Sequence, residues 1–374
     1  MSERDFVLVT TPAELESVAR QLDGCQFHAL DTESNSGFAY KERLCLLQLN
    51  IDSTLVLVDL VRLATSGGTM EPLRGPLEDP ERATWLHGGE FDVGCMKRDF
   101  GIHLKGIWDT QQAASYLEWP KTGYGALVER VCGVTLPKGH SLFDWSRRPL
   151  DSQALAYALD DVRYLPRVRE HLAVAVEQAG IAEEVEMAGR AVEAAEWSGA
   201  FQPDGFWKIK GASKLPPGAI PELVSLWHFR EQEAERLNLP PGRVLNNQLL
   251  LALARAAPGD TAALRRLGVR GRRSAESGSG VLDAIRSAST DPPAVPPAPA
   301  RQPRVPGQKS RAERLKQWRR KEAERRGVSL QVVLATRSLE YLALHGAADL
   351  DAVPLLGASR LGRYGDQLLE LCRP

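Results

Sequence analysis

The hydrophobic pattern of the chain changes near Pro216, and this change limits the folds available to it. From Phe6 to about His171, short apolar segments alternate with amphipathic stretches, a pattern typical of an α/β domain. After Pro216 only the period of helices remains. At 374 residues, the chain is long enough for two or three domains. We therefore expect an α/β domain, with a mixed sheet flanked by helices, followed by all-α domains.

Four apolar segments of the first part are predicted strands, and four amphipathic segments are predicted helices. The strands are Phe27–Thr32, Leu44–Asn50, Leu55–Asp59 and Thr84–His87. The first three lie close enough in sequence to form an antiparallel meander. The helices are Pro12–Leu22, with Thr11 as N-cap, then Asp92–Phe100, Tyr124–Val131 and Ser152–His171.

The helical part contains an internal repeat. Four short segments recur at one offset of 89 residues: Ala234-Glu235-Arg236 with Ala323-Glu324-Arg325, Val244-Leu245 with Val333-Leu334, Leu253-Ala254 with Leu342-Ala343, and Leu267-Gly268 with Leu356-Gly357. A constant register across four segments indicates a duplicated helical domain. Between the copies, Asp291–Gly307 holds seven of the 24 prolines, which predicts a semi-rigid linker.

The net charge of −1 conceals an uneven distribution of charge. Lys309–Arg326 carries nine Lys or Arg residues against three Glu, and five arginines lie within 265–273 without an acid among them. Both stretches are candidates for contacts with nucleic-acid phosphates. For Lys309–Arg326, with its interspersed Glu residues, a solvated helix surface is a serious alternative.

Several other classes of protein are disfavoured. The longest apolar runs are far shorter than the roughly 20 residues that a membrane helix needs, and the first ten residues lack the apolar core of a signal peptide. We therefore expect a cytoplasmic protein without a membrane passage. The five cysteines have no CxxC spacing, which argues against a zinc knuckle or a disulfide framework.

Five residues form the most informative pattern. Asp31 and Glu33 stand two apart on a predicted strand, so both side chains leave the same face of the sheet. Tyr157 and Asp161 stand four apart on a predicted helix, which places them on one side of it. Asp92 follows the segment that ends at His87, near a helix start.

Four carboxylates in one cleft require compensating charge, because like charges at short range raise one another's pKa. Oxygen ligands of this kind suit Mg²⁺ or Mn²⁺, and two such ions about 4 Å apart catalyse phosphodiester hydrolysis. Each element has a simpler explanation when taken alone: a solvated acidic pair, a helix-initiating Asp, or an exposed helix face. Their occurrence together, on elements able to converge, favours the metal site.

These motifs resemble the ribonuclease D family of the DEDD exonuclease superfamily, whose catalytic domain has the ribonuclease H-like fold. Asp31-Thr32-Glu33, His87-Gly88-Gly89-Glu90-Phe91-Asp92 and Tyr157-Ala158-Leu159-Asp160-Asp161 resemble its three exonuclease motifs. Supporting segments are Leu46-Leu47-Gln48-Leu49, Asp109-Thr110-Gln111, Asp144-Trp145 with Arg148-Pro149-Leu150, and Trp207-Lys208-Ile209-Lys210-Gly211. Both helical copies resemble the HRDC domain that helicases and ribonuclease D proteins share.

The resemblance implies a 3′–5′ exoribonuclease of the tyrosine type that uses two divalent ions and releases nucleoside 5′-monophosphates. Asp31 would bridge the two ions, Glu33 and Asp161 would complete the first, and Asp92 would support the second. Tyr157 would orient the attacking water. The implied substrate is structured RNA with a 3′ end, such as a tRNA precursor. An exonuclease acting on DNA and a non-catalytic nucleic-acid-binding scaffold are the alternatives.

We expect further substrate contacts from Thr32, His87, Phe143, Arg265, Arg266 and Arg270. Phe143 lies in a loop, Lys138–Asp144, that departs from the family pattern, and a buried aromatic is its alternative explanation. The predicted segments are an exonuclease domain with its exit segment over 1–215, a first HRDC domain over 216–290, a Pro-rich linker over 291–308, and a second HRDC domain over 309–374.

Overall fold

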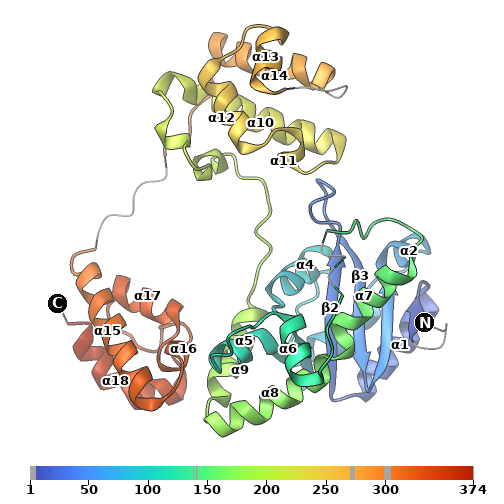
Figure 1. Ribbon diagram of the computed structural model, residues 1–374, viewed down its shortest axis with the longest axis vertical. Helices are drawn as coiled ribbons and strands as arrows, with labels where there is room; N and C mark the ends of the chain where they lie inside the picture. Colours follow the sequence, from blue (N-terminus) through green and yellow to red (C-terminus); the bar gives the residue numbers. More distant parts are fainter. Residues whose placement is uncertain (1–5, 138, 140–141, 270–273, 299–304, 374) are drawn as a thin grey trace. The chain divides into compact units, whose positions relative to one another are not determined.

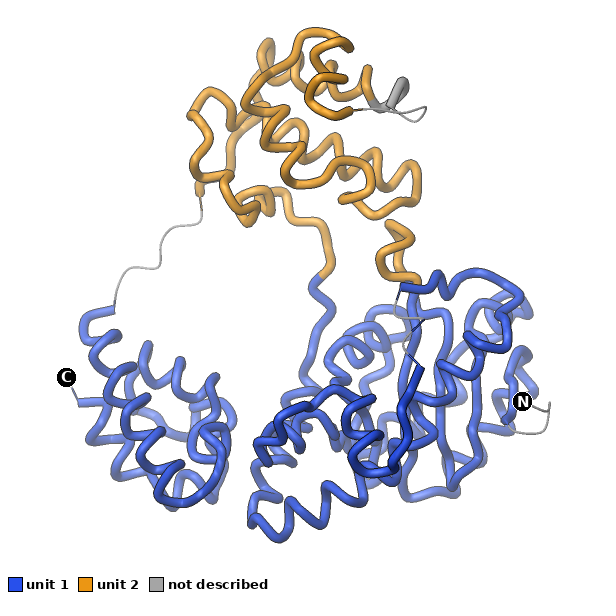
Figure 2. Tube along the Cα trace, viewed as in Figure 1, with its two compact units in different colours: residues 1–34, 43–198, 304–374 blue, residues 35–42, 199–303 orange. Residues whose placement is uncertain are grey.

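The computed structural model describes residues 6–137, 139, 142–269, 274–298 and 305–373. The chain divides into two compact units (Figure 2). Unit 1 comprises Met1–Ser34, Arg43–Ser198 and Arg304–Pro374, and unit 2 comprises Asn35–Glu42 and Gly199–Pro303. The sheet, the acidic motifs and the second helical copy therefore belong to unit 1, whereas the first helical copy belongs to unit 2.

A six-stranded sheet in the order β1-β4-β3-β2-β5-β6 forms the centre of the first domain (Figure 1). The strands are β1 (Val7–Val9), β2 (Phe27–Ser34), β3 (Leu44–Ile51), β4 (Thr54–Asp59), β5 (Ala83–Leu86) and β6 (Ile107–Asp109). Strands β2, β3 and β4 pair antiparallel in sequence order, which confirms the predicted meander. The three remaining pairs, β1 with β4, β2 with β5 and β5 with β6, are parallel. The mixed sheet flanked by helices is the predicted fold class.

The helices of this domain cover both faces of the sheet. They are α1 (Pro12–Gly24), α2 (Leu60–Thr65), α3 (Glu71–Glu78), α4 (Glu90–Phe100), α5 (Thr110–Tyr116), α6 (Tyr124–Cys132), α7 (Ser152–Arg163), α8 (Leu165–Ala179) and α9 (Ala182–Glu193). The predicted N-cap of α1 is confirmed, because Thr11 and Glu14 form a reciprocal capping box. The short strands β1 and β6, and helices α2, α3, α5 and α9, were not predicted.

The single helix predicted over Ser152–His171 is wrong, because the structure has two helices that meet at Tyr164. Pro166 lies in the first turn of α8, where its missing N–H costs nothing, whereas a continuous helix would lose a backbone hydrogen bond there. Tyr157 and Asp161 both remain on α7, so their four-residue spacing still places them on one side of a helix.

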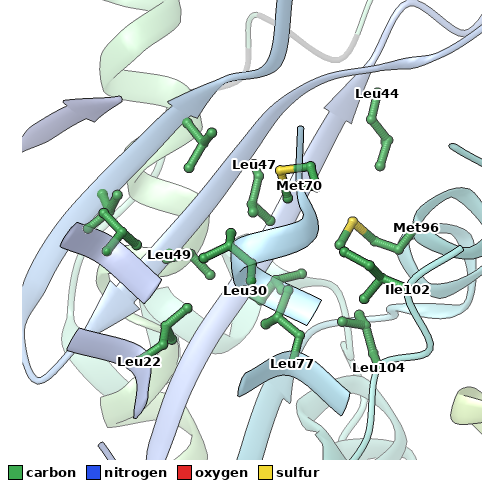
Figure 3. Packing of buried hydrophobic residues seen from close by; sticks show 14 of the residues in the cluster. Leu22, Leu30, Leu44, Leu47, Leu49, Met70, Leu77, Met96, Ile102 and Leu104 are labelled. Carbon is green, nitrogen blue, oxygen red and sulfur yellow. The ribbon is translucent and has the colours of Figure 1, made fainter. Parts of the chain in front are cut away.

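The alternation of side chains divides the core between the two faces of the sheet. Leu30, Leu47 and Leu49 pack on one face with residues of α1, α3 and α4 (Figure 3). Ala29, Leu46 and Leu57 point the other way, into a second cluster with the buried side of α7. The odd-numbered residues of β2, Asp31 and Glu33 included, share the face that α7 covers.

The chain after Pro216 contains helices and no strands among its described residues. In the first copy they are α10 (Ile220–Leu237), α11 (Pro241–Val244), α12 (Asn247–Ala256), α13 (Thr261–Leu267) and α14 (Ser274–Thr290). In the second copy they are α15 (Gln308–Arg326), α16 (Leu330–Val333), α17 (Thr336–His345) and α18 (Gly357–Leu371). Three short 3₁₀ turns, Gly205–Lys208, Ala212–Lys214 and Pro217–Ala219, precede the first copy.

Equivalent bonds recur in the two copies at the offset of 89 residues. Arg230 donates to the carbonyl oxygen of Leu245 at 3.1 Å, and Arg319 donates to that of Leu334 at 2.9 Å. The ion pair of Arg236 with Glu233 is likewise repeated by Arg325 with Glu322, each at 2.7 Å. The repeated sequence therefore encodes a repeated structure.

The second copy packs against α9 within unit 1. The Glu183 carboxylate accepts hydrogen bonds from the backbone N–H groups of Ala358 and Ser359 at the start of α18. Gly357 adopts a φ of +69°, and a Cβ there would lie 2.3 Å from the Met187 Sδ. Only glycine permits this approach. Among the described residues, no helix is both long and apolar enough to cross a bilayer.

Candidate active site

Strand β2 positions the first acidic pair in the middle of the sheet, between β3 and β5. Asp31 pairs with Gln48 and Glu33 with Leu46, so both carboxylates lie on the face that α7 covers. The register of β2 with β3 shifts between Glu33 and Ser34, where regular pairing ends. The pair therefore lies near the end of a central strand, as the sequence predicts.

Helix α7 brings the third carboxylate to this face. The Asp151 side chain caps the helix by accepting from the N–H groups of Gln153 and Ala154 at 3.0 and 2.8 Å. At the other end, the Asn50 amide donates to the carbonyl oxygen of Val162 at 3.1 Å and ties the helix to β3. Ligand oxygens of Asp31, Glu33 and Asp161 then lie within 4.8 Å of one another.

Asp92 reaches the same region from α4 and is 7% exposed. The Thr32 hydroxyl, between the two acidic residues of β2, donates to the Asp92 carboxylate. The sequence predicts that Thr32 contacts the substrate. In the structure the Thr32 side chain is buried and its hydroxyl is hydrogen-bonded to Asp92. A direct contact of Thr32 with the substrate stays a prediction.

The loop before α4 is held by Asp109, at the end of β6. Its carboxylate accepts from the N–H groups of Gly88 and Gly89 at 3.1 and 2.9 Å, and also caps α5. Gly88 has a φ of +67°, and a Cβ there would meet the Gln111 side chain at 3.0 Å. The second acidic motif thus depends on Asp109, which the sequence analysis noted only as part of a supporting segment.

Burial raises the pKa of all four carboxyl groups, and neighbouring carboxylates add to the shift. For Glu33, burial followed by the nearby charges of Asp161 and Asp92 raises the pKa to about 9. Burial, followed by Asp92, Asp161 and Glu33, also raises the pKa of Asp31 well above its ordinary value. The pKa of Asp161 rises to about 7 and that of Asp92 to about 6, in both cases chiefly through burial. A nearby positive charge would reverse these shifts.

Tyr157 lies one helical turn before Asp161, and its side chain is half-buried. Burial and the charges of Asp161, Glu33 and Asp31 raise the pKa of its hydroxyl, which therefore keeps its proton. Its ring lies 6.0 Å from that of Trp145, which in turn lies 4.9 Å from Phe143. Phe143 is partly buried against this cluster, and stacking of its ring on a base stays a prediction.

His87 lies at the end of β5 and shares a hydrogen bond of 2.9 Å with the Thr110 hydroxyl. Because that hydroxyl donates to the Leu86 carbonyl oxygen at 3.0 Å, the Nδ1 of His87 is the donor to Thr110. Burial lowers the pKa of His87 to about 4, which keeps the ring neutral at neutral pH. Its Nε2 is then an acceptor, suited to a hydroxyl or amino group of a substrate.

Sequence reasoning missed Tyr124, which faces the acidic residues from α6. Its ring lies 5.3 Å from that of His87, and its hydroxyl donates to the Asp160 carbonyl oxygen at 3.0 Å. Burial and the charges of Asp161 and Asp31 raise the pKa of this hydroxyl. An isolated aromatic at a helix start gave no signal in the sequence. Phe91, beside Asp92, is 46% exposed and was likewise not singled out as a site residue.

The basic residues separate into two groups. Arg265 and Arg266 are exposed on α13, and Arg270 lies outside the described residues. In α15, by contrast, Arg311, Arg314 and Arg319 donate to backbone carbonyl oxygens, and Arg325 pairs with Glu322. Much of the basic stretch over Lys309–Arg326 therefore stabilises the second copy.

The donor set fits divalent cations of the Mg²⁺ type. All three grouped ligands are carboxylates, without histidine or cysteine, which is the chemistry of hard oxygen-seeking ions. Burial and the neighbouring carboxylates raise the pKa of Asp31 and of Glu33, and a divalent cation would offset this mutual repulsion. The same residues would regain their ordinary ionisation on binding such ions.

Comparisons with known proteins agree with this geometry. The family model of the 3′–5′ exonuclease domain matches residues 6–177, and that of the HRDC domain matches residues 223–285 and 308–372. Ribonuclease D of Gluconacetobacter diazotrophicus is 31% identical over 373 residues, which is 98% of this chain and 93% of the relative. Ribonuclease D of Escherichia coli K12 is 28% identical over 296 residues, covering 79% of this chain and 78% of the relative.

The crystal structure of Escherichia coli ribonuclease D, described as an exoribonuclease involved in structured RNA processing, aligns with a TM-score of 0.73. That alignment has 26% identity and covers 98% of each chain. Sequence and structure therefore agree over nearly the whole length. The chain belongs to the ribonuclease D family.

Proposed function

We propose that this 3′–5′ exoribonuclease of the ribonuclease D family uses two divalent ions, Mg²⁺ or Mn²⁺, to release nucleoside 5′-monophosphates from structured RNA. The exonuclease domain of the family implies dependence on divalent metal. The single observation that carries the proposal is the grouping of Asp31, Glu33 and Asp161 within 4.8 Å, with Asp92 joined to it through Thr32.

Each residue has a separate task in this proposal. Asp31 and Glu33 hold the ions from β2, Asp161 completes the set from α7, and Asp92 supports it from α4. When bound, the ions lower the pKa of water and offset the charge that develops on the attacked phosphate. Tyr157 retains its proton, so its hydroxyl orients the attacking water without removing a proton from it.

The substrate side of the proposal rests on the relatives and on the distribution of charge. The two ribonuclease D relatives favour RNA over DNA as the substrate. His87 would accept from a substrate hydroxyl or amino group, because its Nδ1 is the donor to Thr110. Arg265 and Arg266 would contact phosphates of the RNA body, with Arg270 as a further candidate. A tRNA precursor as substrate and a cytoplasmic location stay predictions.

The test is hydrolysis of a single-stranded RNA carrying a 3′-hydroxyl, with products separated by chromatography. We expect Mg²⁺ or Mn²⁺ to support stepwise release of 5′-mononucleotides. EDTA should abolish this release, and Asp31→Ala should lower the rate by about 10³-fold or more, because metal ions supply several kcal/mol of transition-state stabilisation.

Asp160→Asn is the matched control. Asp160 adjoins Asp161, but its carboxylate pairs with Arg163 at 3.0 Å, so this variant should retain most of the activity. Activity that persists in EDTA, or in Asp31→Ala, would contradict the mechanism. DNA of the same sequence, tested in parallel, should be the poorer substrate, and faster cleavage of DNA would overturn the assignment to RNA.

A further inference from the structure

A buried amide without a partner lies directly beside the first acidic residue. Gln48, on β3, is fully buried, and neither its amide nitrogen nor its amide oxygen has a hydrogen-bond partner. Buried polar groups in folded proteins almost always have partners, so each exception calls for an explanation. A leucine or isoleucine would fill this central position of the sheet without that cost.

The register of the sheet fixes what Gln48 faces. Gln48 is the cross-strand partner of Asp31, and such partners share one face with their Cβ atoms about 5 Å apart. Its neighbours along the same face of β3 and β4 are Leu46 and Leu57, which are apolar and fully buried, and Asn50, whose amide nitrogen donates to the carbonyl oxygen of Val162. The Asp31 carboxylate is therefore the charged group that the topology places next to this amide.

Asn50 gives an internal comparison on the same strand and the same face. Its amide nitrogen donates to the carbonyl oxygen of Val162, so Asn50 has a structural task in anchoring α7. Gln48 lies two residues away and has no such bond. Its side chain makes no described contribution to holding the fold together, which leaves the adjacent acidic pocket as the reason for a polar residue here.

We propose that Gln48 is a positioning residue for Asp31: when divalent cations occupy the acidic pocket, its Nε2 donates to an Asp31 carboxylate oxygen and holds that carboxylate in its ligating orientation. Hydrogen bonds from neighbouring groups commonly fix the orientation of metal ligands in this way. A neutral amide suits the task, because it orients the carboxylate without neutralising the charge that attracts the cations. The inference rests on the proposed binding of metal by this pocket.

The test compares wild type with Gln48→Met, which keeps the length of the side chain and removes its polar atoms. Mn²⁺ affinity is measured by calorimetry without RNA, and the melting temperature is measured with and without Mn²⁺. We expect Mn²⁺ affinity to fall by about 10- to 100-fold. The metal-free melting temperature should stay the same or rise, because an unpaired buried amide has been removed.

A merely structural role would give the opposite pattern, with a lower metal-free melting temperature and an unchanged Mn²⁺ affinity. That result would overturn the proposal. Gln48→Leu provides a second variant if the methionine packs poorly, and the same two readouts apply to it.

His28→Leu is the matched control. His28 is a buried polar residue of β2 on the opposite face of the sheet, where its Nδ1 also lacks a partner. This variant should leave Mn²⁺ affinity within about twofold of wild type. An equal loss of affinity in His28→Leu would show that any change in this core weakens binding, and would contradict a specific role for Gln48.

Metal binding by the pocket and the positioning role of Gln48 give separate outcomes in these measurements. If wild type itself binds no Mn²⁺, the proposed function fails. If wild type binds Mn²⁺ and hydrolyses RNA while Gln48→Met binds Mn²⁺ equally well, the positioning role alone is excluded.

Discussion

Two regions of the chain treat their buried charged side chains in opposite ways. In the acidic pocket, Asp31, Glu33, Asp92 and Asp161 gather with little compensation, and the pKa of each is raised. In the second helical copy, Arg360 is 2% exposed, yet its three guanidinium nitrogens donate to the carbonyl oxygens of Val332, Leu355 and Gln331 at 2.8–2.9 Å.

The difference separates a functional site from a structural one. A buried charge that donates to several carbonyl oxygens holds elements together, as Arg360 does for the short helix α16 and the turn before α18. A cluster of like charges without such partners is unfavourable until a ligand of opposite charge arrives. The acidic pocket therefore lowers the stability of the metal-free fold, and the same clustered charges allow it to bind cations.

The largest expected effect is on the pH dependence of the metal-free protein. Each carboxyl group in the pocket has a folded-state pKa above its ordinary value, so the folded state binds protons more tightly than the unfolded state. Stability should therefore fall as pH rises from about 4.5, the ordinary value for Glu33, to about 9, its folded value. The melting temperature measured between pH 7 and 9, where His28 and His87 are neutral, reports this fall.

Two additions sharpen that measurement. The double variant Asp31→Asn with Glu33→Gln should flatten the decline, because it removes two of the groups whose pKa is raised. Mn²⁺ should stabilise wild type more at pH 9 than at pH 7, since binding displaces protons from the carboxyl groups. A metal-free melting temperature that rises over this range would contradict the view of the pocket as uncompensated.

The next effect concerns the structural arginine. Arg360→Met should lower the free energy of unfolding of the second copy by about 3 kcal/mol, because several carbonyl oxygens lose a charged donor at once. Amide hydrogen exchange of the second copy, resolved by mass spectrometry on the full chain, measures this change.

Arg363→Met is the control, since Arg363 is exposed on the same helix. It should change the protection of the second copy by no more than about 0.5 kcal/mol, the usual range for surface substitutions. Equal effects of the two substitutions would show that burial of Arg360 contributes nothing special to the fold.

The smallest effect tests the exposed arginines of the first copy. Replacing Arg265 and Arg266 together with Ala should weaken binding of RNA by about threefold to tenfold at low salt. It should also reduce the slope of log affinity against log salt by about 1.4, or 0.7 for each lost phosphate contact.

The double variant Arg320→Ala with Lys321→Ala removes the same charge from exposed positions of the second copy. It should weaken RNA binding less than the Arg265 and Arg266 double variant does, if the second copy mainly packs against the exonuclease domain in unit 1. An equal or larger loss of affinity would assign the RNA contact to the second copy instead.

The sequence by itself determined the fold class, the meander and the family. These follow from local information: alternation places Asp31 and Glu33 on one face, four-residue spacing places Tyr157 and Asp161 on one side of a helix, and a constant offset of 89 reveals the duplication. The break at Tyr164 was missed because the amphipathic pattern continues through it, although Pro166 marks the new helix.

Only the tertiary structure decided which polar residues lie at the acidic pocket and which form hydrogen bonds or ion pairs that stabilise the fold. Thr32 bonds to Asp92, 60 residues away, and Gln48 on β3 is the cross-strand partner of Asp31 on the adjacent strand β2. Most arginines of Lys309–Arg326 have structural partners, a distinction that a count of charges cannot make. The physical reason is that the burial and the pairing of a charged side chain depend on residues distant in sequence. Burial and pairing together decide whether that charge stabilises the fold or binds a ligand.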